Sequence, residues 1–285
     1  MQSGKNLPAT VITIEPPSGW FSLNLRDIWR YRDLLLLLVY RDFVSLYKQT
    51  ILGPIWFLIQ PIMTTLVFTL VFKNIAGIST DGLPGILFYL AGITCWSYFS
   101  ESLTKTSETF TANANVFGKV YFPRIIVPLS IVASGLLKFA VQFILFIAVL
   151  FYYKLVGEKI QMNTTVFLFP LLVLLMAMIG LGAGMIISSM TTKYRDLRFL
   201  LQFAIQLAMY GTPVIYPAST LPEKYQWIIN ANPLTPILET FRHAFLGVGQ
   251  YSPLHLAYST GFATTILLVG TVIFNRVEKT FMDTV

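Results

Sequence analysis

Charged residues are scarce in this chain. Asp, Glu, Lys and Arg make up 12% of its 285 residues, whereas about a quarter of the residues in a soluble domain are charged. Hydrophobic residues make up 55% of the sequence, and its mean hydropathy is +0.68. This composition excludes an ordinary soluble domain and predicts a protein that crosses a membrane several times.

Residues and motifs that carry chemistry are also scarce. The single cysteine, Cys95, permits neither an internal disulfide nor a cysteine cluster for zinc. The two histidines, His243 and His255, lack the spacing of metal ligands. The sequence contains no GxxxxGK[ST], GxGxxG or HExxH motif. We therefore expect no catalytic residue, metal or cofactor on this chain, so energy for uphill transport would come from a partner.

The predicted spans contain no carboxylate pair. Ion-driven carriers normally place Asp or Glu within the membrane, and the nearest acid here is Glu101, at the cytosolic end of a predicted span. This pattern disfavours a carrier that works alone.

The N-terminal 50 residues lack a signal peptide and a spanning helix. Residues 1–24 contain no apolar segment with a small-residue cleavage site, and they predict a polar cytosolic leader. In residues 25–50, arginines lie among aromatic residues, and the apolar run at 34–40 is far shorter than the roughly 20 residues of a span. This region predicts a cytosolic amphipathic helix at the membrane surface. Gly53 and Pro54 mark its join to the first span, because Pro fits the first turn of a helix.

Long apolar runs fill the rest of the chain and predict an all-α integral membrane protein with six transmembrane helices. Residues 51–285 should form one membrane domain, with spans at 52–72, 85–102, 125–153, 166–190, 197–213 and 254–274. The third of these runs is unusually long, so this helix should tilt or project from the bilayer.

Lysine and arginine predict which side of the membrane each loop faces. The formal net charge is +7. Most of the lysines and arginines lie in the N-terminal segment, the loops after the second and fourth spans, and the C-terminal tail. Short cytosolic loops hold the excess of positive residues, so both termini are expected in the cytosol. The positive charge then indicates orientation and contact with anionic lipids rather than nucleic acid.

Two connecting segments have patterns of their own. Residues 212–251 hold several prolines and apolar pieces too short to cross, which predicts two short re-entrant helices; a pair of helices lying on the surface is the alternative. In the cytosolic loop 108–124, Asn113 and Asn115 suit a helix start or turn, and Val116, Phe117, Val120 and Tyr121 could present a surface to a soluble partner. Aromatic residues dipping into lipid headgroups would explain this loop equally well.

Polar residues recur on one face of two predicted spans. Arg198, Gln202, Gln206 and Tyr210 recur every four residues, as do Gln60 and Thr64. Such stripes either line a wet path or bond across helices.

Two further features of the spans predict contacts. Gly180, Gly182 and Gly184 should let another helix approach closely. Lys138, deep in a span, should have a carboxylate or carbonyl partner or reach the interface.

Several motifs together resemble one family. The segment YRDFVSLYKQTILGPIWFLIQP at 40–61 is similar to the opening of permease subunits of type-2 ABC exporters for polysaccharides. The pieces KVYFPRIIVP, KYRDLR, TPVIYP and NPLTPI, and a tail with Glu278, follow in the family's order. The resemblance covers nearly the whole chain from about residue 25 and is greatest to Wzm-type O-antigen permeases, with teichoic-acid and capsule permeases also similar.

The resemblance implies a homodimer in a bacterial inner membrane, with two separate ABC ATPase subunits that carry the ATP and Mg. The substrate would be a polysaccharide linked to polyprenyl pyrophosphate, passing through a channel between protomers. Arg41 and Lys48 would guide the pyrophosphate or anchor to phospholipid. An ion-driven flippase that works alone and a membrane scaffold that transports nothing are the alternatives from other classes.

The resemblance also implies roles for individual residues. Contact with the ATPase would involve Asn113, Asn115, Val116, Phe117, Tyr121 and Arg124. The interface helix would use Arg41, Asp42, Tyr47, Lys48 and Gln49. The channel would be lined by Trp56, Gln60, Thr64, Gln202, Gln206 and Tyr210. The re-entrant gate would hold Tyr216, Pro217, Pro222, Asn232 and Pro233.

Overall fold

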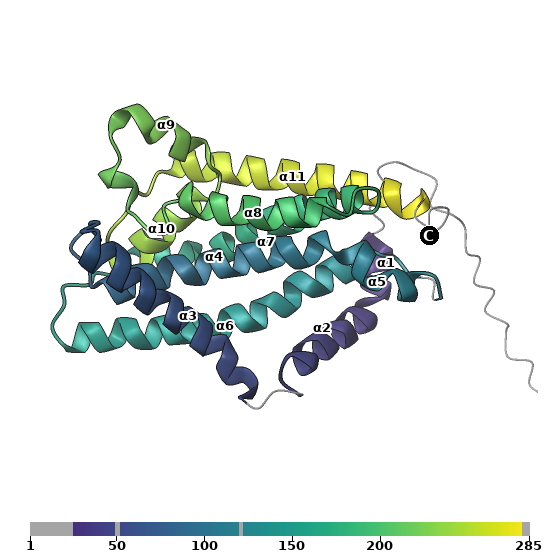
Figure 1. The fold of residues 1–285 in the computed structure, drawn as a ribbon, viewed down its shortest axis with the longest axis horizontal. Helices are drawn as coiled ribbons and strands as arrows, with labels where there is room; N and C mark the ends of the chain where they lie inside the picture. The colour runs from purple at the N-terminus through teal and green to yellow at the C-terminus, as the bar shows by residue number, and fades with distance from the viewer. Residues whose placement is uncertain (1–24, 49–51, 120–121, 281–285) are drawn as a thin grey trace, which may run out of the picture.

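The computed structural model describes residues 25–48, 52–119 and 122–280, and within these ranges the regular elements are all helical (Figure 1). The leader 1–24 and the predicted site residues Gln49 and Tyr121 lie outside the described ranges. The helices are α1 (Leu25–Arg30), α2 (Arg32–Tyr47), η1 (Gly53–Ile55), α3 (Trp56–Phe68), η2 (Thr69–Ile75), α4 (Gly85–Ser107), α5 (Thr109–Phe117), α6 (Ile126–Leu155), η3 (Thr164–Leu168), α7 (Phe169–Thr191), α8 (Leu197–Tyr210), η4 (Ala218–Thr220), α9 (Glu223–Ala231), α10 (Thr235–Leu246) and α11 (Pro253–Thr280).

Proline and glycine set several of the helix ends. Pro54 and Pro170 lie in the first turns of η1 and α7, where a missing N–H removes no helical hydrogen bond. Gly247 ends α10 with φ of 74°, a left-handed conformation that glycine adopts without a Cβ penalty. The predicted join at Gly53 and Pro54 is confirmed, since η1 leads directly into α3.

Helix α4 forms the centre of the bundle. It packs against α3, α6, α7, α8 and α10, and most of its side chains are buried, including Leu87, Phe88 and Tyr89. Because its neighbours surround it, α4 can carry Ser and Thr residues that a helix facing lipid would avoid.

Glycines bring α7 close to two neighbouring helices. A Cβ on Gly180 would lie 2.9 Å from Ser102 of α4, and one on Gly184 would lie 2.5 Å from Thr106. On another side of α7, a Cβ on Gly182 would lie 2.7 Å from the backbone of Ile266 in α11. The predicted close approach at these glycines is confirmed.

Four helical segments are long and apolar enough to cross a membrane within the described residues: Gly53–Ile75, Ile126–Leu155, Thr164–Thr191 and Pro253–Glu278. The predicted length of the third run is confirmed, because α6 has 30 residues. The other two predicted spans differ from this pattern. Helix α4 has 23 residues but a more polar composition, and α8 has only 14, where a span needs roughly 20.

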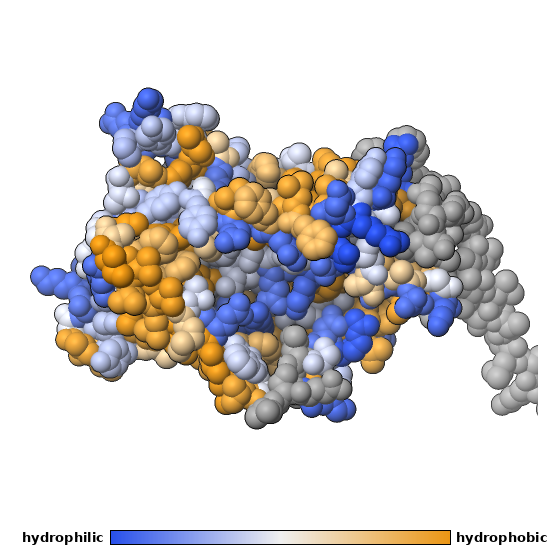
Figure 2. Space-filling model, in the orientation of Figure 1, coloured by the Kyte–Doolittle hydropathy of each residue, from blue (hydrophilic) through white to orange (hydrophobic). Residues whose placement is uncertain are grey.

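The two ends of the bundle carry different segments. Helices α1 and α5 and the C-terminal end of α11 lie at one end, and α9 and α10 lie at the opposite end (Figure 1). The face toward the viewer carries a hydrophilic area between apolar surfaces (Figure 2). Helices α1 and α5 and the end of α11, which belong to predicted cytosolic segments, therefore lie at the same end of the molecule.

Candidate functional site

Helix α2 contains most of the predicted interface residues and lies against the bundle. It packs on α6 and buries Leu38, while Leu36 and Leu37 are both 62% exposed. Arg41 and Asp42 form an ion pair of 2.7 Å on α2, and Lys48, just beyond its end, is exposed. Tyr47 is the last residue of α2. An exposed apolar face beside charged residues suits a helix lying at the membrane interface.

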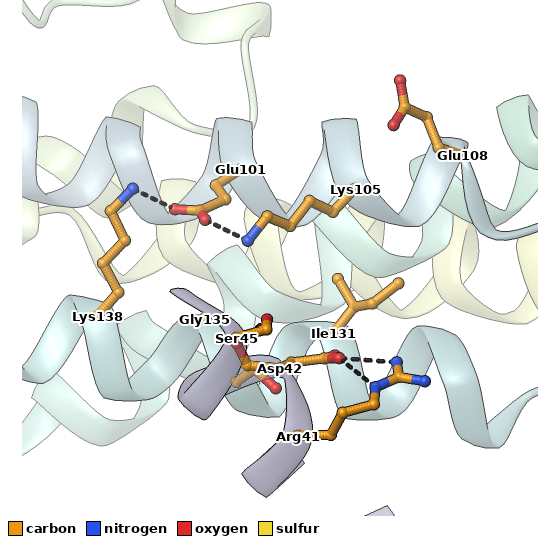
Figure 3. Close-up of a pocket in the computed structure, with 10 residues that line it drawn as sticks. Arg41, Asp42, Ser45, Glu101, Lys105, Glu108, Ile131, Gly135 and Lys138 are labelled. Carbon is orange, nitrogen blue, oxygen red and sulfur yellow. Dashed lines mark hydrogen bonds and ion pairs between the residues drawn. The ribbon is translucent and has the colours of Figure 1, made fainter. Parts of the chain in front are cut away.

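A polar cleft of about 240 Å³ lies between α2, α4 and α6 (Figure 3). Its lining residues are Arg41, Asp42, Ser45, Glu101, Lys105, Glu108, Ile131, Ser134, Gly135 and Lys138. The Glu101 carboxylate forms ion pairs with Lys138 at 2.8 Å and with Lys105 at 2.7 Å. Of the alternatives expected for Lys138, the structure shows a carboxylate partner, and this ion pair joins α6 to α4.

The predicted coupling segment forms helix α5. This helix begins at Thr109, so Asn113 lies within it rather than at its start, and the Asn113 side chain donates to the Thr109 carbonyl at 2.9 Å. Asn115 and Val116 are exposed, as a contact with a partner requires.

The predicted surface position of Phe117 is wrong, since Phe117 is only 4% exposed. Its ring lies 6.0 Å from the ring of Phe110, which stacks on Phe274 of α11 at 4.5 Å. Burying an aromatic ring is more favourable than exposing it, so the ring turns inward and holds α5 on the bundle.

Arg124 connects the loop after α5 to α11. Its guanidinium Nη1 donates to the Glu278 carbonyl at 2.7 Å, and its backbone N–H donates to Glu278 Oε1 at 3.2 Å. The guanidinium also lies 5.3 Å from the centre of the Phe117 ring. Arg124 is 9% exposed, so it positions neighbouring elements and leaves little surface for a partner.

The predicted channel residues lie mostly on exposed faces. Gln202, Gln206 and Tyr210 are exposed on α8, which buries only Leu201 among its side chains. On α3, Trp56 and Gln60 are exposed, whereas Thr64 is half-buried and donates to the Gln60 carbonyl at 2.9 Å. Within one described chain the polar faces of α3 and α8 remain open to a further partner.

The segment between α8 and α11 forms two short helices with different surroundings. Helix α10 is buried throughout most of its length, whereas α9 exposes Tyr225, Trp227 and Ile228. The two short helices predicted here are therefore present, but only α10 is enclosed by the protein.

Hydrogen bonds hold the predicted gate residues in place. Asn232 Nδ2 donates to Thr212 Oγ1 at 2.8 Å, and the Pro233 carbonyl accepts from Ser259 of α11 at 2.8 Å. The Tyr216 hydroxyl donates to the Tyr210 carbonyl at 2.9 Å. Pro217 is buried and Pro222 is exposed.

Arg242 of α10 is a buried centre that the sequence did not indicate. It is 1% exposed, lies 3.3 Å from Glu239 Oε1, and donates to the carbonyls of Pro213 and Val214. Its guanidinium carbon is 3.9 Å from the centre of the Phe88 ring in α4. Arg242 thus joins α10, the segment after α8, and α4. An arginine in a predicted external loop gave no signal of this burial.

No group of three or more His, Cys, Asp or Glu side chains within the described ranges could hold a metal ion. The cleft and the exposed faces present charged, polar and apolar side chains.

The chain is similar to proteins that bear transport names. One O-antigen export system permease protein of Klebsiella pneumoniae is 31% identical over 252 residues, which cover 88% of this chain and 94% of the relative. A protein of the same name from Myxococcus xanthus is 26% identical, covering 78% of this chain and 83% of its own length. A capsule polysaccharide export inner-membrane protein of Neisseria meningitidis is 23% identical, with 85% and 90% covered. The family model described as ABC-2 type transporter matches residues 33–246, and the protein belongs to this family.

Proposed function

We propose that this protein is the permease subunit of an ATP-driven exporter that moves a polysaccharide across a bacterial inner membrane. The supporting observation is the similarity to O-antigen export permeases, which extends over 88% of the chain for the relative that is 31% identical. O-antigen-like polysaccharide is the first choice of substrate. Capsular polysaccharide is the second, because the capsule relative is 23% identical, and teichoic acid is a further alternative that follows from the resemblance alone.

The proposed membrane topology has six spans and both termini in the cytosol. Four segments have the length and hydropathy of a span. Helix α4 would be a further span, because other helices surround it in place of lipid. Helix α8, lengthened by the residues after Gly211, would be the remaining one of the six spans. The gathering of α1, α5 and the end of α11 at one end supports this topology (Figure 1), and the basic residues of these segments favour the cytosol.

The transport path would lie between two copies of the chain. The polar residues exposed on α3 and α8 would face this path, with α9 and α10 at its outer end. Polar side chains in a span are favourable where they meet water or another helix, so pairing of two protomers explains why neither face is covered within one chain. A membrane lumen of this kind needs no catalytic residue.

ATP hydrolysis would occur on two separate ABC ATPase subunits, which hold the ATP and Mg. The exposed residues Asn115 and Val116 of α5 would contact the ATPase, together with the end of α2. Arg41 and Lys48 would meet the pyrophosphate of a polyprenyl-linked glycan, because a pyrophosphate pairs favourably with cations.

Surface polysaccharide in a strain that lacks the chromosomal gene tests this function. Plasmid-borne protein should restore the surface polymer only when its ATPase partner can hydrolyse ATP. A partner with a Lys→Ala change in its phosphate-binding loop should give intracellular polymer and none at the surface. Export that persists with the inactive ATPase would contradict the proposal and favour an ion-driven flippase.

A further inference from the structure

Around Glu101, the cleft between α2, α4 and α6 contains unequal numbers of positive and negative side chains. A single carboxylate, that of Glu101, pairs through one oxygen with Lys105 and through the other with Lys138. Two ammonium groups and one carboxylate leave one positive charge uncompensated. Figure 3 shows both lysines converging on Glu101 above α2.

The lysines retain hydrogen-bonding capacity beyond these ion pairs. An ammonium group has three N–H donors, and each of these two makes one ion pair with Glu101. Lys138 is 19% exposed and Lys105 is 44% exposed at the side chain, and both line the cleft. A ligand in the cleft could therefore accept from both lysines while Glu101 keeps them in place.

The other charged groups of the cleft leave this positive centre largely uncancelled. Arg41 and Asp42 neutralise each other on α2, with Nη2 and Oδ1 2.7 Å apart. Glu108 also lines the cleft, but its carboxylate points away from the Glu101 ion pairs (Figure 3). An anion entering the cleft would meet the two ammonium groups beside Glu101.

Neighbouring surfaces indicate what kind of anion reaches this place. The apolar side chains of Leu36, Leu37 and Tyr40, which are 62%, 62% and 67% exposed, lie on the helix that covers the cleft. A helix of this kind lies among lipid headgroups and the first part of the acyl chains. Lipid phosphate is the anion that is abundant at that depth, and charged lysines there favour it.

We propose that the cleft is a binding site for the phosphate of a membrane lipid, with Lys105 and Lys138 donating to phosphate oxygens and Glu101 positioning both ammonium groups. The phosphate belongs either to a phospholipid headgroup or to a polyprenyl pyrophosphate. The site does not depend on the transport function, because binding can be measured without export.

Binding of phosphatidylglycerol with a fluorescent acyl chain tests the site on the full-length protein in a neutral detergent. Diacylglycerol with the same labelled chain lacks only the phosphoglycerol headgroup and serves as the lipid control. We expect phosphatidylglycerol to bind at least tenfold more tightly than diacylglycerol, and the difference to shrink as salt rises because salt screens partly exposed charges. Equal affinities for the two lipids would overturn the proposal.

Two variants remove the positive charge without removing the cleft. Lys138→Gln and Lys105→Gln each leave one ammonium group with Glu101, so each should weaken phosphatidylglycerol binding about tenfold, which corresponds to about 1.4 kcal/mol. Lys154→Gln, which removes an exposed lysine at the other end of α6, should leave binding unchanged. If both cleft variants elute and unfold like the unsubstituted protein and bind with unchanged affinity, the proposal is overturned.

Glu101→Gln distinguishes a binding site from a purely structural ion pair. This change leaves two ammonium groups without a carboxylate, so phosphatidylglycerol should bind more tightly than it binds to the unsubstituted protein. A structural role alone predicts lower thermal stability with no gain for either lipid, and that result would count against the site.

Competition identifies the source of the phosphate. Undecaprenyl pyrophosphate and an unlabelled phospholipid are each used to displace labelled phosphatidylglycerol from the unsubstituted protein. If undecaprenyl pyrophosphate acts at much lower concentrations than the phospholipid, the site is assigned to a lipid carrier. Equal competition by both would assign it to membrane lipids in general. If unlabelled diacylglycerol competes as strongly as either of the lipids that carry phosphate, the site does not recognise phosphate and the proposal is contradicted.

Discussion

The charged residues that are buried in the described part of the chain each have several partners. Arg242 has a carboxylate, two carbonyl oxygens and an aromatic ring around its guanidinium. Taking such a charge out of water is expensive, and the surrounding groups offset that penalty together. Glu239, 3% exposed, also accepts from the backbone N–H of Gln250. Each partner of this pair would therefore be left uncompensated if the other were removed.

Arg242→Met should destabilise the protein strongly. Breaking a buried pair by removing one partner costs about 3 to 5 kcal/mol, so the thermal unfolding midpoint of the detergent-solubilised protein should fall by several degrees. The double variant Arg242→Met with Glu239→Gln should recover part of this loss, because no unpaired carboxylate remains. Lys224→Met, at an exposed position on α9, provides the control. An Arg242→Met variant as stable as that control would refute the account.

Neighbouring residues of α5 should differ in what they contribute. Val116 is 43% exposed and Phe117 is 4% exposed, so only Val116 offers surface to a partner. Val116→Asp should reduce polysaccharide export and ATPase co-purification while leaving thermal stability unchanged. Phe117→Ala should lower stability by about 3 to 5 kcal/mol, as expected for a buried aromatic ring, and should reduce export through this loss. Normal export by a Val116→Asp protein would remove α5 from the proposed ATPase contact.

Individual helices contact each other at distances that only glycine allows. Gly270 of α11 lies against the carbonyl oxygen of Gly182 in α7, and an added Cβ would collide with that backbone oxygen. Gly261 of the same helix has nothing within 4 Å of the place where a Cβ would lie. These two positions separate the effect of packing from the effect of helix propensity.

Gly270→Ala should destabilise the protein, and Gly261→Ala should not. Forcing an extra carbon into a packed contact costs about 1 to 3 kcal/mol, whereas alanine in place of an exposed helical glycine gains about 0.5 to 1 kcal/mol. Thermal unfolding of the two purified variants under identical detergent conditions measures the difference. Equal midpoints for the two proteins would mean that α11 can move away from α7 without loss.

The sequence predicts helices well where local pattern determines them. The length of α6, the join at Gly53 and Pro54, and the close approach at Gly182 all follow from runs of apolar, proline or glycine residues. Properties that depend on distant neighbours could not be predicted. The ring of Phe117 is buried beside Phe110, and Phe110 stacks on Phe274 of α11, which lies far away in the sequence.

The candidate site shows the same division. The need of Lys138 for a partner follows from the cost of a lone charge in an apolar helix, but the sequence leaves open which group supplies it. Glu101 is close only because α4 packs on α6. The burial of Arg242 was missed for the same reason, since no local pattern brings Pro213 and Val214 to α10.

At the scale of the whole molecule, the exposed polar face of α8 and the exposed start of α3 require an explanation outside one chain. Gln206 and Gln60 are both exposed, and pairing of two protomers across these faces would place both along a shared path. The chain is suited to cysteine crosslinking, because its single native cysteine, Cys95, is buried.

Two differently tagged copies should therefore crosslink, one carrying Gln60→Cys and the other Gln206→Cys, both with Cys95→Ala. Flexible bismaleimide reagents of increasing length should join the tags in native membranes, and a covalent dimer carrying both tags on a denaturing gel measures the product. A copy with Leu155→Cys, which is 88% exposed at the end of α6, should not join to the Gln206→Cys copy with the same reagents. If the dimer carrying both tags is no more abundant than in that control, a path between α3 of one protomer and α8 of the other is contradicted. The polar stripes would then serve contacts with other membrane helices.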